Sequence, residues 1–435
     1  MSGNLDAAPT EFAEHLVERA MRGGADAAQV TATRSNYFEI DFSERGIDLL
    51  RSITNSSASI TIFRDGKLGS ASVNGCNADD IEAALAAAQT AADAGIKDPA
   101  NGIADAPLLP KGEYGHKEPQ RDAMIASAEG FIRELSQRYP AIRTRNSIYS
   151  FSDFERSFAN SLGVRQSERR GKYGFGAGFC GKDGRRTTSV NYSGAASFEP
   201  FERLLGVGTV QRLIEETLRS FERKPVPGKF VGDVIITPDC LRSLMGSITN
   251  ALSGSALFAG TTPYKGRKGE QIASEKFSLL NRPRSPEFPG GADFDGFGVP
   301  TKDLDVVKDG VLNEFLIGFF MARKLGVPQT AGARNFLVPP GDAPIDEIVA
   351  KTRRGVVFSR FSGGRPNSNL DFSGVAKNSF YVEDGEVKHA LGETMVSGNF
   401  QALLKQIHAV SRECVNFGGS CYPYVAASGV TISSR

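Results

Sequence analysis

The side chains best suited to zinc-dependent hydrolysis are scattered along this sequence. Its four histidines are His15, His116, His389 and His408, and no two of them share a short motif. Peptide hydrolysis by zinc needs two or three clustered ligands with a general base beside them. We therefore predict that these histidines are surface or capping residues and that the chain has no metal or other cofactor of its own.

Two other patterns match parts of known ligand-binding motifs. Residues 176–181 read Gly-x-Gly-x-x-Gly, but a dinucleotide fingerprint needs a helix directly afterwards, and a turn and another strand are expected here. Asp293 and Asp295 are spaced like the first ligands of a calcium loop, yet Leu304 occupies the position of the bidentate glutamate. We predict a packed glycine-rich hairpin in the first case and a solvated loop in the second.

The charge balance argues against a nucleic-acid partner. The 435 residues include 51 basic and 50 acidic side chains, for a formal net charge of +1, so no overall field attracts phosphates. The densest basic run, Arg165–Arg170, is interrupted by Gln166 and Glu168 and is typical of a solvated strand edge. We expect no binding to nucleic acid.

Membrane association and secretion are not expected either. No 18 consecutive residues are apolar, and Met1–Pro9 lacks the basic start and hydrophobic run of a signal peptide. The five cysteines are widely spaced and odd in number, unlike the disulfide framework of a small secreted protein. We predict a cytoplasmic protein.

The elements that would position any site follow from the apolar periodicity. Asn77 is placed to cap one helix, and Pro238 is placed to begin another, whose apolar residues form one face. Alternating apolar and polar runs joined by Asp-Gly turns predict antiparallel hairpins. The expected helices cover residues 11–21, 79–94, 121–138, 202–223, 238–252, 313–325 and 399–410, and the expected turns lie at 65–66, 182–184, 308–310 and 383–385.

Two domains are expected from the chain length and the loop composition. The segment 95–119 is rich in Gly, Pro and Asp and predicts a linker, and the stretch Lys224–Gly228 predicts the main boundary. The fold class is α+β. An N-terminal α/β domain covers residues 1–224, with a possible subdomain split near 95–119. A mostly antiparallel-β domain with a few helices covers residues 225–435.

Five segments of the C-terminal half form an ordered set. They are Val234–Leu252, Phe294–Thr301, Asp309–Leu312, Phe372–Ala376 and Met395–Phe400. In their order and spacing they resemble the TldD/PmbA peptidase family, and the resemblance runs from about residue 11 to residue 434. It implies the same arrangement, an N-terminal α/β domain followed by a mostly β C-terminal domain.

The resemblance also indicates where a metal site would lie. TldD-type subunits carry His-Glu-x-x-x-His on the helix after the first strand of the C-terminal domain, and by that alignment Met245, Gly246 and Asn250 occupy the motif positions. None of these is a strong zinc ligand or a general base. Cys414 lies near the place of a zinc-binding cysteine and is interpreted as structural or vestigial. The chain is therefore similar to the TldE (PmbA) type, which lacks the zinc motif.

This similarity implies a non-catalytic subunit, inactive alone, of a complex that cleaves unfolded or precursor peptides. Zinc is expected in a TldD-type partner, in a heterodimer or higher heteromer, and a homodimer is a further possibility. Arg334 and Asn335, beside an expected strand, are the candidate peptide-binding residues. Two alternatives remain open. One is a stand-alone hydrolase that uses unidentified residues, and the other is a peptide-binding or regulatory protein without catalysis.

Overall fold

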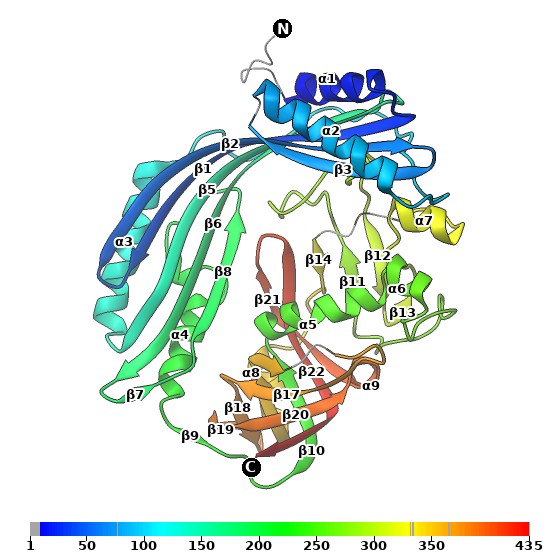
Figure 1. Ribbon diagram of the computed structural model, residues 1–435. Coiled ribbons are helices and arrows are strands. Elements are labelled where there is room, and N and C mark those ends of the chain that lie inside the picture. The colour runs from blue at the N-terminus through cyan, green and yellow to red at the C-terminus, as the bar shows by residue number, and fades with distance from the viewer. Residues whose placement is uncertain (1–8, 76, 331, 333–334, 364–365, 435) are drawn as a thin grey trace.

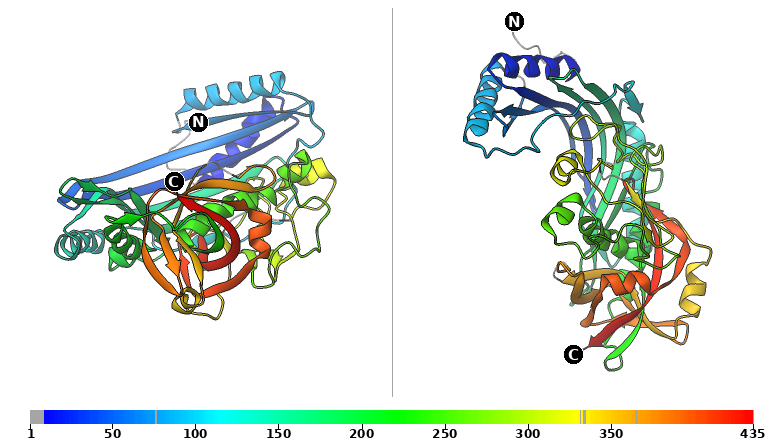
Figure 2. Two further views of the ribbon diagram at one scale, coloured as in Figure 1. Left: turned by 90° about the horizontal axis from the view of Figure 1, so that it is seen from below. Right: turned by 90° about the vertical axis from the view of Figure 1, so that its right-hand side faces the viewer.

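The computed structural model describes residues 9–75, 77–330, 332, 335–363 and 366–434. The chain forms two sheets, and the long strands of the first curve around one side of the second (Figure 1). In the right-hand view of Figure 2, the first described helix (Pro9–Arg22) and the last strand (Ser420–Ser434) lie at opposite ends of the molecule. The α+β class expected from the sequence is confirmed.

Four long strands dominate the N-terminal sheet. They pair antiparallel in the order β2, β1, β5, β6, and shorter strands extend the sheet at both sides. The strands are β1 (Ala27–Ser43), β2 (Gly46–Arg64), β3 (Lys67–Asn74), β4 (Gly112–Tyr114), β5 (Ile142–Asn160), β6 (Arg165–Asp183), β7 (Arg186–Thr187) and β8 (Asn191–Ser197).

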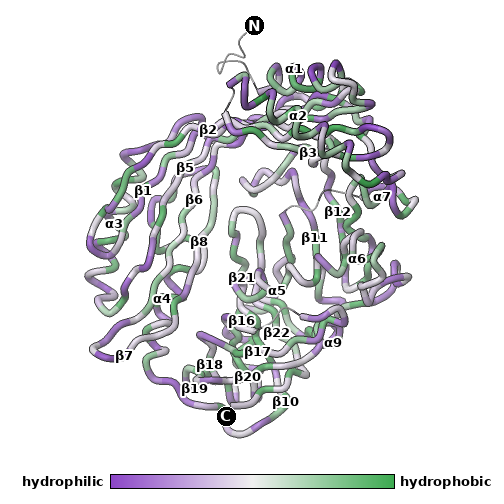
Figure 3. Tube along the Cα trace, viewed as in Figure 1, coloured by the Kyte–Doolittle hydropathy of each residue, from purple (hydrophilic) through white to green (hydrophobic). Residues whose placement is uncertain are grey.

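The two faces of this sheet differ because side chains alternate along a strand. In β5 and β6 the buried residues Tyr149, Phe151, Tyr173 and Phe175 alternate with serine and glycine, and the hydropathy changes along the long strands (Figure 3). Helices α3 (Arg121–Arg138) and α4 (Val210–Arg219), with the 3-10 turn η1 (Leu204–Gly206), cover the aromatic face. Helices α1 (Pro9–Arg22) and α2 (Ala78–Ala94) cover the other end of the sheet.

The C-terminal sheet has 14 strands built around β10 (Phe230–Ile236). β10 pairs antiparallel with β22 (Ser420–Ser434) and parallel with β15 (Arg354–Phe358). The other strands are β9 (Arg223–Lys224), β11 (Leu279–Asn281), β12 (Leu304–Lys308), β13 (Val311–Leu312), β14 (Phe336–Leu337), β16 (Arg360–Gly363), β17 (Asp371–Lys377), β18 (Phe380–Glu383), β19 (Glu386–Leu391), β20 (Thr394–Asn399) and β21 (Ile407–Asn416). The helices are α5 (Pro238–Ala251), α6 (Gly254–Ala259), α7 (Phe319–Leu325), α8 (Ile345–Ala350) and α9 (Phe400–Lys405).

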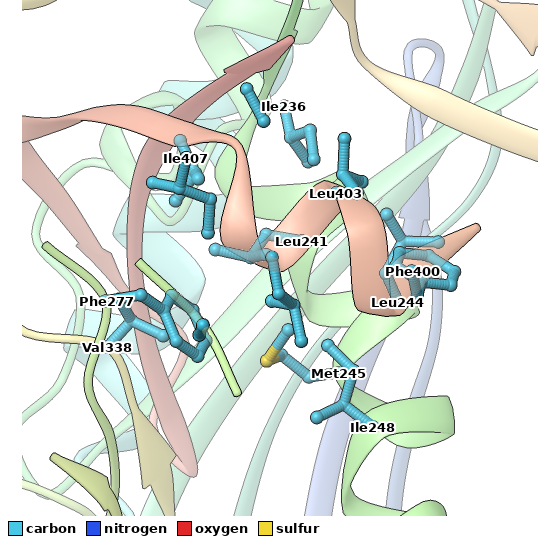
Figure 4. Packing of buried hydrophobic residues seen from close by; sticks show 14 of the residues in the cluster. Ile236, Leu241, Leu244, Met245, Ile248, Phe277, Val338, Phe400, Leu403 and Ile407 are labelled. Atoms are coloured by element: carbon cyan, nitrogen blue, oxygen red, sulfur yellow. The ribbon is translucent and has the colours of Figure 1, made fainter. Parts of the chain in front are cut away.

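Helix α5 begins where the sequence predicts it. The Thr237 hydroxyl accepts a hydrogen bond from the Cys240 backbone N–H at 3.4 Å, and Pro238 occupies the first turn, where a missing N–H costs nothing. The apolar face of the helix packs into the largest core, with Leu241, Leu244 and Ile248 buried (Figure 4). This packing fixes which side of α5 remains open.

Three of the expected turns are hairpins of one type. In each, an Asp-Gly pair has positive φ at both residues, with Asp65 at 52°, Asp309 at 48° and Asp384 at 49°. These values suit the two-residue turns whose twist matches antiparallel strands. They join β2 to β3, β12 to β13 and β18 to β19.

Three expected helices are shorter than predicted. The segment 202–223 contains η1 and α4, which are separated around Gly208, where φ is +55°. The helix expected over 313–325 begins only at Phe319, and the one expected over 399–410 ends at Lys405 because β21 starts at Ile407. Among the described helices, none is both long and apolar enough to cross a bilayer.

Candidate functional site

A cavity of about 540 Å³ lies against the open face of α5. Four of its lining residues, Ser243, Gly246, Ser247 and Asn250, follow the i, i+3, i+4, i+7 spacing of a single helix face. The remaining lining residues come from the end of α5, from α6 and the loop after it, and from the loop before β17. They are Ala251, Ala256, Thr261, Pro366, Asn367, Ser368 and Leu370.

The three motif positions of α5 do not share one environment. Gly246 and Asn250 line the cavity, whereas Met245 is 3% exposed and lies in the core beside Leu241 and Ile248 (Figure 4). Gly246 and Asn250 are four residues apart and share one face of the helix. Of the three motif positions, Gly246 and Asn250 therefore line the cavity, and Met245 does not.

The described residues that line the cavity carry no charged side chain. Their polar side chains are hydroxyls and carboxamides, which donate and accept hydrogen bonds but bind zinc weakly. Gly246 has no side chain, so the two motif positions that face the cavity supply one carboxamide and no base. Within the described parts of the chain, no group of three His, Cys, Asp or Glu residues is arranged to hold a metal ion. A zinc ion does not fit this lining.

The wall opposite α5 is held by a small hydrogen-bonded turn. The Asn367 side-chain oxygen accepts from the Asp371 backbone N–H at 2.9 Å, and the Asn399 side-chain amide donates to the Asp371 carboxylate at 2.8 Å. Hydrogen bonds from Asn399 and Asn367 lower the pKa of the Asp371 carboxyl. The turn therefore keeps its shape while the carboxylate is ionised.

Cys414 is not among the residues that line this cavity. It lies on β21, where its Sγ is 2.6 Å from the Sγ of Cys421 on β22. The interaction between the two sulfurs lowers the pKa of Cys421, whereas the same interaction and burial raise the pKa of Cys414. The structure thus gives Cys414 a sulfur partner that its position in the sequence did not indicate.

Of the two candidate peptide-binding residues, Arg334 lies outside the described residues. Asn335 is 5% exposed, and its side-chain amide donates to the Arg282 carbonyl at 3.3 Å. Its φ of 54° places the backbone in the left-handed region, which Asn tolerates better than most residues. This hydrogen bond holds the loop at Asn335, and a role of Asn335 in peptide binding stays a prediction.

The basic run Arg165–Arg170 is not the solvated edge that the sequence suggested. Arg169 and Arg170 are 7% and 5% exposed, because β6 lies inside the sheet between β5 and the pair β4 and β8. Arg170 Nη2 is 2.9 Å from Asp293 Oδ1, and the Asp293 backbone N–H donates to Glu168 at 2.8 Å. The expectation of a solvated loop is also wrong for Asp293, since this contact docks the loop onto β6.

A second buried charged cluster joins α4 to α5. Arg212 pairs with Glu216 and with Asp239, and Glu216 also accepts hydrogen bonds from Ser359 at 3.3 Å and Asn378 at 3.0 Å. Burial raises the pKa of Glu216, and Arg212 opposes that shift. We did not anticipate this cluster, because its members come from three separate parts of the sequence. It positions α5 against the N-terminal domain.

The glycine pattern at 176–181 lies within β6, opposite residues of β5 and β8, and no helix follows it. The expectation of a packed glycine-rich hairpin is confirmed, since β6 pairs antiparallel with β7 and β8 after the turn. The phosphate-binding geometry of a helix N-terminus is absent at this point of the described chain.

Comparison with known proteins gives two family matches. Residues 227–434 match the PmbA/TldA metallopeptidase C-terminal domain, and residues 28–93 match PmbA/TldA metallopeptidase domain 1. The first match contains α5 and the other described residues that line the cavity. The second covers most of β1, β2, β3 and α2.

Relatives span nearly the whole chain. A Haemophilus influenzae protein called a metalloprotease PmbA homolog is 23% identical over 91% of this chain and 89% of its own length. The crystal structure of TldE from Thermococcus kodakarensis is similar, with 22% identity, a TM-score of 0.83, and coverage of 97% of this chain and 99% of that one. The crystal structure of a putative modulator of DNA gyrase from Bacteroides thetaiotaomicron is also similar, with 23% identity, a TM-score of 0.87, and coverage of 98% of each chain. At these identities, the structural likeness shows a shared fold.

Proposed function

The chain belongs to the PmbA/TldD family of metallopeptidase-like proteins, and from this premise we propose that it acts in the cytoplasm as the non-catalytic, TldE-like subunit of a metallopeptidase complex. In this proposal a TldD-type subunit supplies the zinc and the general base. The complex cleaves unfolded or precursor peptides, and this chain contributes the surface around α5.

One observation carries the proposal, namely the side-chain chemistry on the open face of α5. This helix follows the first strand of the C-terminal domain, where the family resemblance places a zinc motif. Gly246 and Asn250 face the cavity there, and Met245 is buried in the core. Loss of both nitrogen ligands and of the base removes metal binding and water activation together.

The cavity lining supports a role in peptide binding. Ser243, Ser247 and Asn250 offer hydroxyl and amide groups that can donate to or accept from the main chain of an extended peptide. Main-chain hydrogen bonds do not depend on the peptide sequence, so they suit a complex that cleaves many unfolded substrates.

The test is to measure zinc content and peptide cleavage for three samples from the same source: this chain alone, the TldD-type subunit alone, and their mixture. We expect no stoichiometric zinc and no cleavage of an unfolded peptide by this chain alone. We expect both in the mixture, with cleavage above that of the TldD-type subunit alone. Stoichiometric zinc and cleavage in this chain alone would mean that it is itself a hydrolase with other ligands. Identical activity of the partner with and without this chain would also refute the proposal.

A variant tests the cavity directly. A Cβ added at Gly246 meets no atom within 4 Å, so Gly246→Leu should extend into the cavity without disturbing the fold. We expect it to raise the KM of the complex for an unfolded peptide while the partner retains its zinc. Gly130→Leu on α3 is the matched control, since an added Cβ there has only Arg133 Nη2 at 4.0 Å. Equal effects of the two variants would place peptide binding elsewhere.

A further inference from the structure

Two cysteines meet across the β21–β22 hairpin. In the ladder, Cys414 is opposite Pro423 and Asn416 is opposite Cys421. Cys414 and Cys421 therefore occupy diagonal positions, and their side chains share a face because residues two apart on a strand point the same way. Their Sγ atoms are 2.6 Å apart, and both side chains are partly exposed.

The two cysteines flank a hairpin tip that connects three parts of the molecule. The Phe417 carbonyl accepts a hydrogen bond from the Ala196 N–H of β8 at 3.2 Å, and the Gly418 carbonyl accepts from the Gly290 N–H at 2.8 Å. The Arg242 guanidinium of α5 lies 4.8 Å from the centre of the Phe417 ring. In Figure 1 this hairpin points toward β8 of the N-terminal sheet. The tip thus links the two sheets and reaches the helix that carries the cavity.

We propose that Cys414 and Cys421 form a reversible intrachain disulfide, with a small-molecule disulfide such as oxidised glutathione as the oxidant, and that this bond restrains the hairpin tip. The sulfur atoms already face each other, so the bond needs only a small approach of the two side chains. The restraint acts next to the Phe417 and Gly418 carbonyls, through which the tip contacts β8 and the loop at Gly290.

The reaction balances as two successive exchanges. The Cys421 thiolate attacks one sulfur of the glutathione disulfide, that sulfur–sulfur bond breaks, and one glutathione leaves as a thiolate. The Cys414 thiol then releases its proton, and its sulfur attacks the Cys421 sulfur of the mixed disulfide, so the second glutathione leaves. Two protein thiols are oxidised, and one glutathione disulfide is reduced to two thiols.

The environment distinguishes the roles of the two sulfurs. The interaction between the two sulfurs lowers the pKa of Cys421 and raises the pKa of Cys414. A thiolate is the attacking species in disulfide exchange. Cys421 is therefore the first nucleophile, and Cys414 is the resolving thiol.

The experiment equilibrates the full-length chain with glutathione buffers of decreasing reduced-to-oxidised ratio, traps free thiols by alkylation and analyses the peptides by mass spectrometry. We expect loss of two hydrogens and a cross-link between Cys414 and Cys421. In Cys414→Ser we expect Cys421 to retain a glutathione adduct, and in Cys421→Ser we expect Cys414 to acquire one more slowly. Cys180→Ser is the matched control and should still form the cross-link.

Hydrogen exchange at the Ala196 amide tests the structural consequence. Oxidation of the wild-type chain should slow this exchange by about tenfold, since the acceptor carbonyl of Phe417 is then held in place. The same treatment should leave exchange in Cys414→Ser unchanged. The proposal is overturned if both cysteines remain alkylated in the most oxidising buffer, if both carry glutathione without a cross-link, or if the cross-link forms and exchange at Ala196 does not change.

Discussion

Replacing Arg212 with methionine should expose how strongly the buried charged cluster holds α4 to α5. The Arg212 side chain is 24% exposed, and its partners Glu216 and Asp239 are 11% and 18% exposed. Methionine fills much of the same space but leaves two carboxylates without their cation. Removing one partner of a buried ion pair typically costs about 3–5 kcal/mol, so we expect a loss in that range in the free energy of unfolding at neutral pH.

The loss should shrink on acidification. Burial already raises the pKa of Glu216, and the variant also loses the Arg212 charge that opposes this shift. An acid whose pKa is higher in the folded state stabilises that state below its unfolded pKa and loses this contribution as pH rises through the folded pKa. Lowering the pH from about 7.5 to about 5.5 should therefore recover part of the difference between variant and wild type.

The assay is urea denaturation of wild type and variant at both pH values. Circular dichroism monitors the unfolding, because the chain contains no tryptophan whose fluorescence could be used. The double variant Arg212→Met/Glu216→Gln removes the more deeply buried of the two carboxylates, leaves Asp239 without Arg212, and should lose about 1–2 kcal/mol less than the single variant. Arg186→Met is the surface control, because Arg186 and its partner Asp183 are 54% and 53% exposed, and it should cost less than about 1 kcal/mol. If the double variant is as unstable as the single one, the unpaired charge of Glu216 is not the cause.

Three further substitutions address how other elements are held. In Gly69→Ala the new Cβ would lie 2.1 Å from the Ala88 carbonyl oxygen, so α2 must move away from β3. Urea denaturation should show a loss of about 2–3 kcal/mol in the free energy of unfolding. Gly130→Ala, in open space on a helix, should instead raise this free energy by about 0.5–1 kcal/mol. A Gly69→Ala chain as stable as wild type would contradict this packing. Asp293→Asn removes the carboxylate paired with buried Arg170 and should lower the free energy of unfolding by about 3 kcal/mol. Proteolysis of the loop around residue 293 should also become faster. An unchanged denaturation midpoint would show that this pair does not dock the loop.

The sequence by itself determined the elements whose causes are local. Helix α3 spans Arg121–Arg138 as its periodicity predicts, and α2 begins after Asn77, whose side-chain oxygen accepts from the Asp80 N–H. The Asp-Gly pairs predicted the hairpin turns because few other residue pairs adopt positive φ at both positions. The sequence alone also shows that α5 carries no histidine.

Only the tertiary structure decided which of these residues face one another. The periodicity predicts that Met245 and Gly246 are neighbours on one helix. In the folded chain Met245 packs in the core, whereas Gly246 and Asn250 line the cavity. The hairpin between β21 and β22 similarly brought Cys414 and Cys421 together, although nothing in their spacing indicated a pair.

The buried charges show the physical reason most clearly. A run of arginines close together in sequence is typical of a solvated strand edge. That prediction was wrong for Arg170, because its guanidinium contacts Asp293, which lies more than a hundred residues away in the sequence. Arg212 and Glu216 are local neighbours, but Asp239 completes their cluster only when α5 docks. A charge can be buried only where opposite charges and hydrogen bonds converge on it. That convergence is a property of the folded chain, and no local pattern in the sequence records it.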